Sequence, residues 1–371
     1  MSNWMAKLTK DFGTIADDME ISKEQIIEMP SPSLNWAVGN GGIIEGKSLC
    51  LYGPESGGKS LLMQLMIKEI QMKDPEAIAI LFDAEYSFNK YWFEKLGGDP
   101  KRLIVRQTNN PLKIFDYIEH DLYQMVQDGA PVKAIAIDSV KSIRYPKDHK
   151  KQSTDLTMGG GGASYLGPAL KAVLPVIREH NITTLMVQQV YEELDPMKAL
   201  SNPYKIPDGR ALKHFCDYML QVERIDAKKG KIYDAEMKEF GSDRNSLQVG
   251  HEVKVKVKKN RCGAPFRTAK FKLSYDSGII GTHEELAELA KSLGVAFHPI
   301  GPSGKPNNQM WQIGDHDPVR GWDNFVEWLG SDVMIVNELI DACNGVSDEK
   351  SKQRNEELKD DSDIDLNLDE L

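Results

Sequence analysis

The chain has 371 residues, of which 40% are hydrophobic and 27% charged, a balance typical of a globular protein with one large or two medium domains. It excludes a mostly disordered or fibrous chain, and no apolar run approaches the ~20 residues that a membrane span needs. No apolar signal segment opens the sequence, and the four cysteines lack the paired spacing of zinc sites. We therefore expect a protein of the reducing cytoplasm, without a disulfide framework.

The net charge of −10 is concentrated at the C-terminus. Residues 356–371 hold eight acidic side chains and one Lys, a net of −7, so the remaining residues carry only −3. A body that is nearly neutral can hold basic patches for nucleic acid. We expect residues 346–371 to form a disordered acidic tail, which competes with DNA, recruits a basic single-strand-binding or mediator protein, or merely solubilises the chain.

In chain order, residues 1–30 come first and form a polar arm with apolar residues at helical spacing. Short apolar runs then alternate with helical stretches, which predicts a parallel sheet covered on both faces. The expected strands are residues 48–52, 78–83, 103–105, 134–138 and 182–188, and the expected helices are residues 59–72, 91–96, 112–127 and 163–178.

The pattern changes after residue 216. Residues 216–224, 252–260 and 267–275 alternate at period two, which predicts antiparallel strands with one solvated face in a mixed sheet. Residues 281–343 are mainly helical, with a break rich in Gly and Pro, and indicate a small second domain. Two long polar loops, residues 145–162 and 191–210, interrupt the core, and loops of this length are usually functional or disordered.

A phosphate-binding loop stands between the first predicted strand of the core and its helix. Residues 53–60 read GPESGGKS, a complete GxxxxGK[ST] pattern in the context that it requires, which argues against a chance Gly-rich turn. Lys59 is expected to reach the β- and γ-phosphates of a nucleotide, and the Ser60 hydroxyl to ligate Mg²⁺. The backbone around the phosphates comes from Gly53, Pro54, Glu55, Ser56, Gly57 and Gly58.

Polar residues end the neighbouring predicted strands, where ligands of such sheets bind. Asp138 suits outer-sphere Mg²⁺ binding, although an ordinary acid at a strand end is the alternative. Glu85 is the candidate that orients and deprotonates an attacking water, with Asp83 as the alternative that the sequence does not exclude. Gln189 could bond the γ-phosphate and leads into the second loop, but polar strand ends are common.

Across residues 10–343 the chain resembles the RecA-type recombinases. The segments GPESGGKS, FDAEYSFNKYWFEKLGGDP, AIAIDSV, VQQ, GRALK and VKVKKNRCGAPF occur in that family's order and approximate spacing. The length and acidic tail resemble the bacteriophage members, such as UvsX, as well as bacterial RecA, and we favour a bacteriophage recombinase. The resemblance implies an α/β RecA-like P-loop ATPase core with a mixed, mainly parallel sheet in residues 31–280. It also implies an N-terminal oligomerisation arm in residues 1–30 and a small α+β domain in residues 281–345.

The resemblance also implies roles for single residues. Glu85 takes the position of the catalytic glutamate and Gln189 that of the γ-phosphate sensor. Trp92 falls where the family places an aromatic ring against adenine, with helix packing as the alternative. Lys259 and Arg261 match two cations that reach the ATP of a neighbouring subunit; Arg261 stands where the family often has Lys. By the strand pattern alone, exposed lysines that protect a sheet edge would be the commoner interpretation.

The two long loops correspond to the family's DNA-binding loops. Their contacts would go mainly to phosphate and so be sensitive to salt and indifferent to sequence. A solvated polar loop is the alternative, since the second loop also holds acidic residues. The candidate DNA-binding residues are Lys147, Lys150, Lys151, Gly159 and Gly160 in the first loop, Lys171 on the next helix, and Lys198, Lys205, Gly209 and Arg210 in the second.

Together these features predict a DNA-dependent ATPase that uses ATP and Mg²⁺, releases ADP and phosphate, and forms helical filaments on single-stranded DNA. Such a filament would pair its strand with homologous double-stranded DNA and exchange strands. One alternative is a hexameric replicative helicase built on the same core, which the C-terminal domain and the VKVKKN strand disfavour. The other is a recombination mediator that does not hydrolyse ATP, which the intact phosphate loop disfavours.

Overall fold

A ten-stranded mixed sheet is the centre of the computed structural model, which describes residues 22–144, 161–200, 203–207, 209–225, 230–234, 247–301 and 304–346. Six parallel strands lie in the order β10-β3-β7-β6-β4-β5, and antiparallel strands extend the sheet beyond β10 in the order β12-β13-β14, with β11 also paired to β12. The bounds are β3 (Ser48–Gly53), β4 (Ile78–Asp83), β5 (Leu103–Gln107), β6 (Val132–Asp138), β7 (Thr183–Gln189), β10 (Tyr218–Arg224), β11 (Lys231–Asp234), β12 (Leu247–Asn260), β13 (Thr268–Ser274) and β14 (Gly278–Ile280). The predicted fold class is confirmed.

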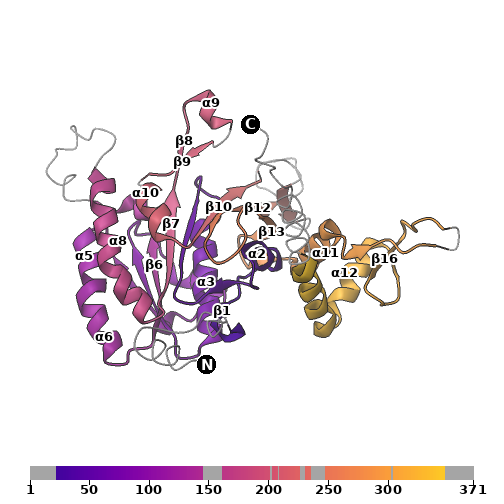
Figure 1. Ribbon diagram of the computed structural model, residues 1–371, viewed down its shortest axis with the longest axis horizontal. Helices are drawn as coiled ribbons and strands as arrows, with labels where there is room; N and C mark the ends of the chain where they lie inside the picture. The colour runs from indigo at the N-terminus through magenta and orange to yellow at the C-terminus, as the bar shows by residue number, and fades with distance from the viewer. Residues whose placement is uncertain are drawn as a thin grey trace, which may run out of the picture.

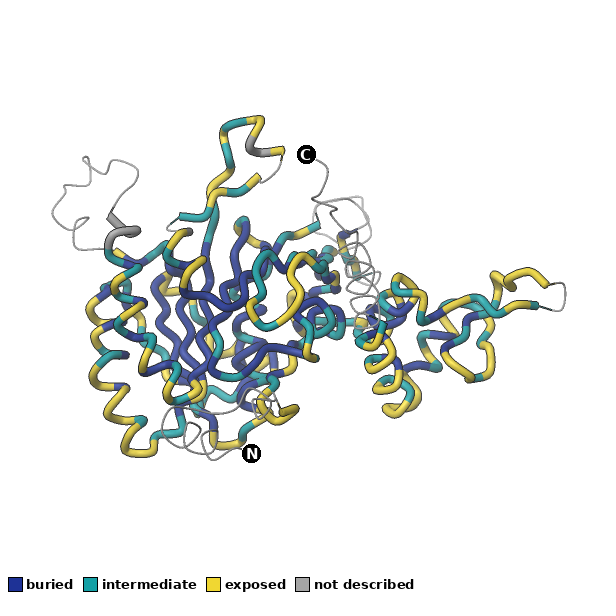
Figure 2. Tube along the Cα trace, viewed as in Figure 1, coloured by how far each residue is buried: buried dark blue, intermediate teal, exposed yellow. Residues whose placement is uncertain are grey.

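Helices cover both faces of this sheet (Figure 1). One apolar core joins one face to α2 (Pro32–Val38), α3 (Lys59–Lys73) and α4 (Lys90–Lys95). A second core joins the other face to α5 (Pro111–Asp116), the π-helical turn η4 (Tyr117–Leu122), α8 (Gly161–Glu179) and α10 (Gly209–Phe215), with α6 (Tyr123–Gln127) continuing η4. The central strands are buried throughout (Figure 2), which explains their continuous apolar runs.

Strand β10 corrects one expectation. Its alternating pattern predicted an antiparallel strand with a solvated face, but β10 pairs parallel with β3 and antiparallel with β12, and even its Gln221 is buried. A strand in the middle of the sheet has helices or loops on both faces, so its polar residues are enclosed. The prediction is confirmed for β12, where Val253, Val255 and Val257 are buried and the lysines between them are more exposed.

The described part of the second long loop contains regular secondary structure. Strands β8 (Tyr191–Glu192) and β9 (Tyr204–Lys205) pair as a hairpin, with the short helix α9 (Pro196–Ala199) between them, and this hairpin projects beyond β7 (Figure 1). The first loop falls almost wholly on residues 145–160, outside the described residues, as does the acidic tail from residue 347 onward.

The end of the expected N-terminal arm packs into the core. The 3₁₀ turn η2 (Lys23–Gln25) leads into β1 (Ile26–Ile27), which pairs with β2 (Ile43–Ile44), and Ile27 and Met29 are buried. A separate arm would therefore have to lie before these residues, in residues 1–21, which are outside the described part of the chain.

A small α+β domain follows β14. Helices α11 (Thr282–Leu293), α12 (Trp322–Gly330) and residues 333–346 pack around Trp311 and Phe325, beside a sheet of β15 (Ala296–Phe297), β16 (Met310–Ile313) and β17 (Val319–Arg320). Glu285 ties this domain to the start of α2, where it accepts hydrogen bonds from the Ser31 hydroxyl at 2.5 Å and the Ser33 amide at 2.8 Å. No helix in the described ranges is both long enough and apolar enough to cross a membrane.

Candidate nucleotide-binding and hydrolysis site

The predicted phosphate loop joins β3 to α3, as its sequence pattern requires. A Cβ atom at Gly53 would lie 2.1 Å from the carbonyl oxygen of Val222 on the neighbouring β10, so only glycine fits there. Gly58 has a φ of 91° where the chain turns into α3, a conformation that glycine adopts without strain. The loop therefore presents the first backbone amides of α3 at the carboxyl end of β3, which makes an anion site.

Lys59 lies inside this loop. Its side chain is 6% exposed, and its ammonium group donates to the Pro54 carbonyl at 2.5 Å. Burial lowers the pKa of Lys59, while the negative charges of Asp138 and Glu85 oppose that lowering. An ammonium group held among acidic side chains is placed to neutralise phosphate.

Asp138 ends β6 and is 5% exposed. Burial raises its pKa to about 6, the carboxylates of Glu85 and Asp83 add to the rise, and a hydrogen bond with Ser60 opposes it. Its Oδ1 atom is buried and has no hydrogen-bond partner in the described parts of the chain.

An orphaned carboxylate oxygen beside a serine hydroxyl suits Mg²⁺, which prefers oxygen ligands and keeps several waters. No group of three or more His, Cys, Asp or Glu side chains in the described ranges is placed to hold a metal ion. A Mg²⁺ ion at Ser60 and Asp138 would therefore depend on phosphate oxygens of a bound nucleotide. The predicted pair fits such an ion.

The structure distinguishes between the two acids that follow β4. Asp83 is 1% exposed and accepts hydrogen bonds from the amides of Ser87 at 3.1 Å and Phe88 at 3.0 Å, and from Gln107 at 3.1 Å. This carboxylate organises the turn after β4 and is shielded from solvent. Glu85 is exposed at the same edge of the sheet. The geometry therefore favours Glu85 over Asp83 as the residue that meets a water.

Glu85 and Gln189 lie in contact, although their strands are separated by β6. The Gln189 amide donates to Glu85 Oε1 at 2.9 Å, and the hydroxyls of Ser139 and Ser142 donate to the same oxygen. Lys141 donates to Gln189 Oε1 at 3.0 Å. The two serines and Lys141 were missed in the sequence. Their only signal was their place after β6: Ser139 directly follows Asp138, and Lys141 and Ser142 lie in the turn η5 (Val140–Ser142).

Trp92 stands on α4, whose buried residue is Phe93. Trp92 itself is only half-buried, so helix packing does not account for the whole side chain. Its contact with adenine stays a prediction.

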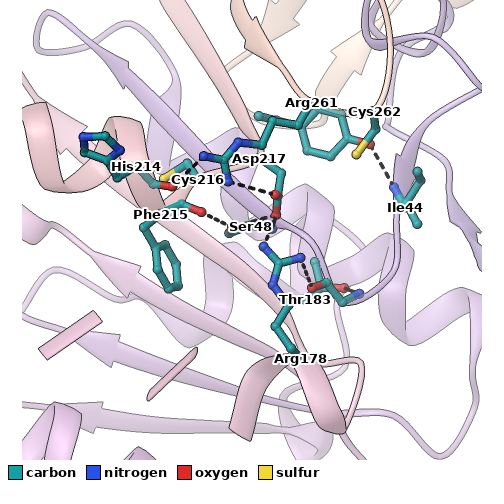
Figure 3. A network of polar contacts seen from close by, with 12 residues as sticks. Ile44, Ser48, Arg178, Thr183, His214, Phe215, Cys216, Asp217, Arg261 and Cys262 are labelled. Carbon is teal, nitrogen blue, oxygen red and sulfur yellow. Dashed lines mark hydrogen bonds and ion pairs between the residues drawn. The ribbon is translucent and has the colours of Figure 1, made fainter. Parts of the chain in front are cut away.

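Lys259 lies near the end of β12, and Arg261 directly follows this strand. Arg261 lies beside His214 at the C-terminus of α10 (Figure 3). Lys259 donates to the carbonyls of Lys213 and Cys216, and Arg261 donates to the His214 carbonyl at 2.9 Å. Burial lowers the pKa of Lys259, and the charge of Arg261 adds to this. The break in the alternation at Lys259 is a bulge, because Met219 pairs with Lys259 while the next residue of β10 pairs with Val257.

Asp217 supports this end of the sheet. It is 4% exposed, and its Oδ2 atom accepts from Arg178 at 2.7 Å and from both the amide and the hydroxyl of Ser48 at 2.9 Å. The guanidinium of Arg261 lies 3.7 Å from the other oxygen, Oδ1 (Figure 3). A buried carboxylate thus links α8, β3, β10 and the strand end that carries the two cations.

The register of the sheet separates these cations from their own phosphate loop. Lys259 is level with Met219, which is level with Cys50 on β3, three residues before Gly53. Three residues of strand span about 10 Å. The chain continues from Lys259 towards Tyr218 and Leu49, further from the loop.

The candidate DNA-binding residues are only partly described. Lys171 on α8, Lys205 on β9 and Arg210 on α10 are exposed, while Lys198 lies in α9 and Gly209 begins α10. The other five, Lys147, Lys150, Lys151, Gly159 and Gly160, lie outside the described residues. The sequence did not indicate how exposed the apolar residues of the hairpin tip are: Leu194, Met197 and Leu200 are 90%, 78% and 85% exposed.

The fold and this site define the P-loop class of proteins, with a RecA-like α/β core. A family model, the RecA N-terminal domain, matches residues 1–280, so the chain belongs to the RecA family of DNA recombinases. It is 31% identical to Protein RecA of Chlorobaculum tepidum over 337 residues, which cover 90% of this chain and 88% of that protein. It is 30% identical to Protein RecA of Aquifex aeolicus over 339 residues (90% and 89%), and 28% identical to that of Mycoplasma mycoides over 318 residues (85% and 82%).

Proposed function

We propose that this protein hydrolyses ATP with Mg²⁺ and forms a filament on single-stranded DNA that pairs with a homologous duplex and exchanges strands. The observation that carries the proposal is the hydrogen bond between Glu85 and Gln189. It joins the expected hydrolytic carboxylate to the last residue of β7, two residues before the hairpin that would hold DNA. A change of nucleotide at Glu85 would thus be transmitted through this hydrogen bond to the hairpin that binds DNA.

In this proposal the α3 amides and Lys59 hold the phosphates of ATP, with Trp92 against the adenine. Ser60 and Asp138 hold the Mg²⁺ ion, which would supply charge neutralisation of the phosphate oxygens. Glu85 is exposed and orients a water, whose proton it accepts. Gln189 bonds the γ-phosphate when that group is present and returns to Glu85 when it is absent.

Lys259 and Arg261 would act on the ATP of a neighbouring subunit. Their distance along the sheet from their own loop supports this assignment, as does their place at a strand end, where Arg261 is exposed and Lys259 half-buried. Their positive charge suits the transition state, in which charge develops on the transferred phosphoryl oxygens. ATP would then sit between subunits and stabilise the filament.

The trans arrangement is tested by mixing two inactive variants. One is Lys59→Ala, and the other is the double variant Lys259→Ala, Arg261→Ala. Mixed filaments contain some interfaces in which an intact loop faces intact cations, so ATP hydrolysis should partly recover. No recovery in mixtures shown to assemble together on DNA would overturn the trans assignment.

Assembly would also use the edge of the sheet. Strand β5 is an edge strand with Ile104 53% exposed, and a groove of about 350 Å³ runs beside it. Its lining is mostly apolar with two lysines: Phe88, Lys90, Pro100, Lys101, Leu103 and Val105. We assign this edge to the N-terminal arm of the neighbouring subunit, because the apolar residues spaced along a mainly polar arm can fill an apolar groove.

DNA would bind at the hairpin, Lys171 and the first loop. The cations would contact phosphates, and the exposed apolar tip suits contacts with unstacked bases. The acidic tail would compete for the same basic surface or recruit a basic partner. The bacteriophage type of recombinase is part of the proposal and is supported by the length and the acidic tail alone.

Electron microscopy with single-stranded DNA and a non-hydrolysable ATP analogue tests the proposal directly. Helical filaments are expected, and closed rings alone would favour the hexameric helicase. An ATPase assay with and without single-stranded DNA tests the mediator alternative: we expect turnover that DNA stimulates, and no turnover under either condition would refute an active ATPase.

A further inference from the structure

Lys141 joins the hydrolytic centre to the projecting hairpin. It lies in the turn after β6, and its ammonium group donates to Gln189 Oε1 at 3.0 Å. The same ammonium group lies 4.5 Å from the centre of the Tyr191 ring, the first residue of β8. A cation at this distance from an aromatic face is attracted to it. One side chain therefore contacts both the end of β7 and the start of the hairpin.

We propose that Lys141 is a positioning residue that sets the orientation of the Gln189 amide and, with it, the attachment of the hairpin through Tyr191. This inference rests on the proposed function and deepens it. The amide of a glutamine has an acceptor oxygen and a donor nitrogen that exchange places when the group turns over. Donation from Lys141 fixes the oxygen on its own side and so presents the nitrogen to Glu85.

Electrostatics agrees with this placement. Burial is the main cause of the lowered pKa of Lys59, and the charge of Lys141 contributes to it, so Lys141 is close enough to act on the phosphate site. Tyr191 is 51% exposed, so the apolar core does not fix its ring. The ammonium group of Lys141 is therefore a specific contact that can hold the ring in place.

The other end of the hairpin segment has a separate anchor. Gln188 is fully buried, and its amide donates to the Pro207 carbonyl at 3.2 Å. This contact precedes α10 and does not involve Lys141. Loss of Lys141 should therefore release the Tyr191 end of the hairpin while the return of the chain into α10 stays in place.

A double-mutant cycle tests the link. The variants are Lys141→Met, which keeps the length and removes the charge, Tyr191→Leu, which removes the aromatic face, and both together. Lys141→Arg and Tyr191→Phe are the matched controls, since they retain the cation and the ring. The readout is steady-state ATP hydrolysis with and without a thymidine oligonucleotide, with kcat and KM for ATP measured separately.

Lys141→Met and Tyr191→Leu should each lower the stimulation of kcat by DNA about 5-fold or more, the size expected from loss of a charge-assisted contact. The double variant should be little worse than Lys141→Met alone, because Tyr191 acts through its contact with Lys141. Lys141→Arg and Tyr191→Phe should retain most of the stimulation, because they keep the cation and the aromatic ring. If the two side chains only filled space, Lys141→Met would be expected to behave like Lys141→Arg, and Tyr191→Leu like Tyr191→Phe.

Unchanged stimulation in Lys141→Met, or a double variant whose loss is the product of the two single losses, would overturn the proposal. If Lys141→Met does not fold, the comparison of Tyr191→Leu with Tyr191→Phe decides, and equal stimulation in those two overturns it. Absence of DNA-stimulated hydrolysis in the unmodified protein would instead refute the proposed function, so the two failures are distinguishable.

Discussion

Replacement of Asp138 by Asn should stabilise the protein when nucleotide and Mg²⁺ are absent, although it should abolish their productive binding. Asp138 is buried, its Oδ1 atom is without a hydrogen-bond partner in the described residues, and its pKa is raised from 3.8 to about 6. The folded state therefore binds a proton on Asp138 more tightly than the unfolded state does. Folding stability from this group is fully present below about pH 4 and is lost as the pH rises through 6.

The magnitude follows from the shift. A rise from 3.8 to about 6, at about 1.36 kcal/mol per pKa unit, corresponds to about 3 kcal/mol at neutral pH. Between pH 5 and pH 8 this group alone should lower the free energy of unfolding by about 1.4 kcal/mol. Urea unfolding of the unmodified protein and of Asp138→Asn, in chelator and without nucleotide, measures the difference. The variant should be more stable by about 2–3 kcal/mol at pH 8, and by less at pH 5.

Asp83→Asn is the matched control, because Asp83 is an equally buried acid on the neighbouring strand that accepts three hydrogen bonds. An amide cannot accept all three, so that variant should lose about 1–3 kcal/mol. If Asp138→Asn is less stable than the unmodified protein at pH 8, or if the gap between them does not widen from pH 5 to pH 8, the desolvation argument is wrong.

Three further outcomes are expected. Lys59→Ala should abolish assembly that depends on ATP, because Lys59 would be the main side-chain charge on the β/γ-phosphates; undiminished ATP hydrolysis would contradict the phosphate-loop assignment. Glu85→Gln should retain ATP binding and filaments while turnover falls on the order of 10²-fold, as measured by phosphate release, and normal turnover would place the base elsewhere. Binding to single-stranded DNA should weaken steeply with salt and vary little with base sequence, and a flat salt titration would contradict the phosphate contacts.

Much of the core was predictable because a strand that is buried on both faces appears in the sequence as a short continuous apolar run. The strand before Asp83 and the strand before Gly53 were found from short apolar runs, and the phosphate loop from a pattern that is itself a description of backbone geometry. The prediction for β10 was wrong. Its residues alternate between apolar and polar, but the strand lies inside the sheet between β3 and β12, so neither of its faces meets water.

The site beyond the phosphate loop depended on contacts that no local pattern encodes. The choice of Glu85 over Asp83 rests on three hydrogen bonds to Asp83, one of them from Gln107 on another strand. Lys141 belongs to no motif in the sequence. It reaches Gln189 because β6, which precedes Lys141, lies beside β7, which ends at Gln189. Side chains converge here from segments that are 48 to 104 residues apart.

The two cations at the end of β12 already have hydrogen-bond partners within their own subunit, and this affects how they could serve an ATP between subunits. In a single subunit Lys259 and Arg261 bond the carbonyls that end α10, and such bonds to charged donors are worth about 1.5–3 kcal/mol each. If they serve a neighbour's ATP, they must give up these partners when the interface closes. The γ-phosphate of ATP would supply the negative charge that offsets this cost, and ADP lacks that group. An interface built this way would close with ATP and open after hydrolysis, which is the behaviour that a filament with nucleotide between its subunits requires.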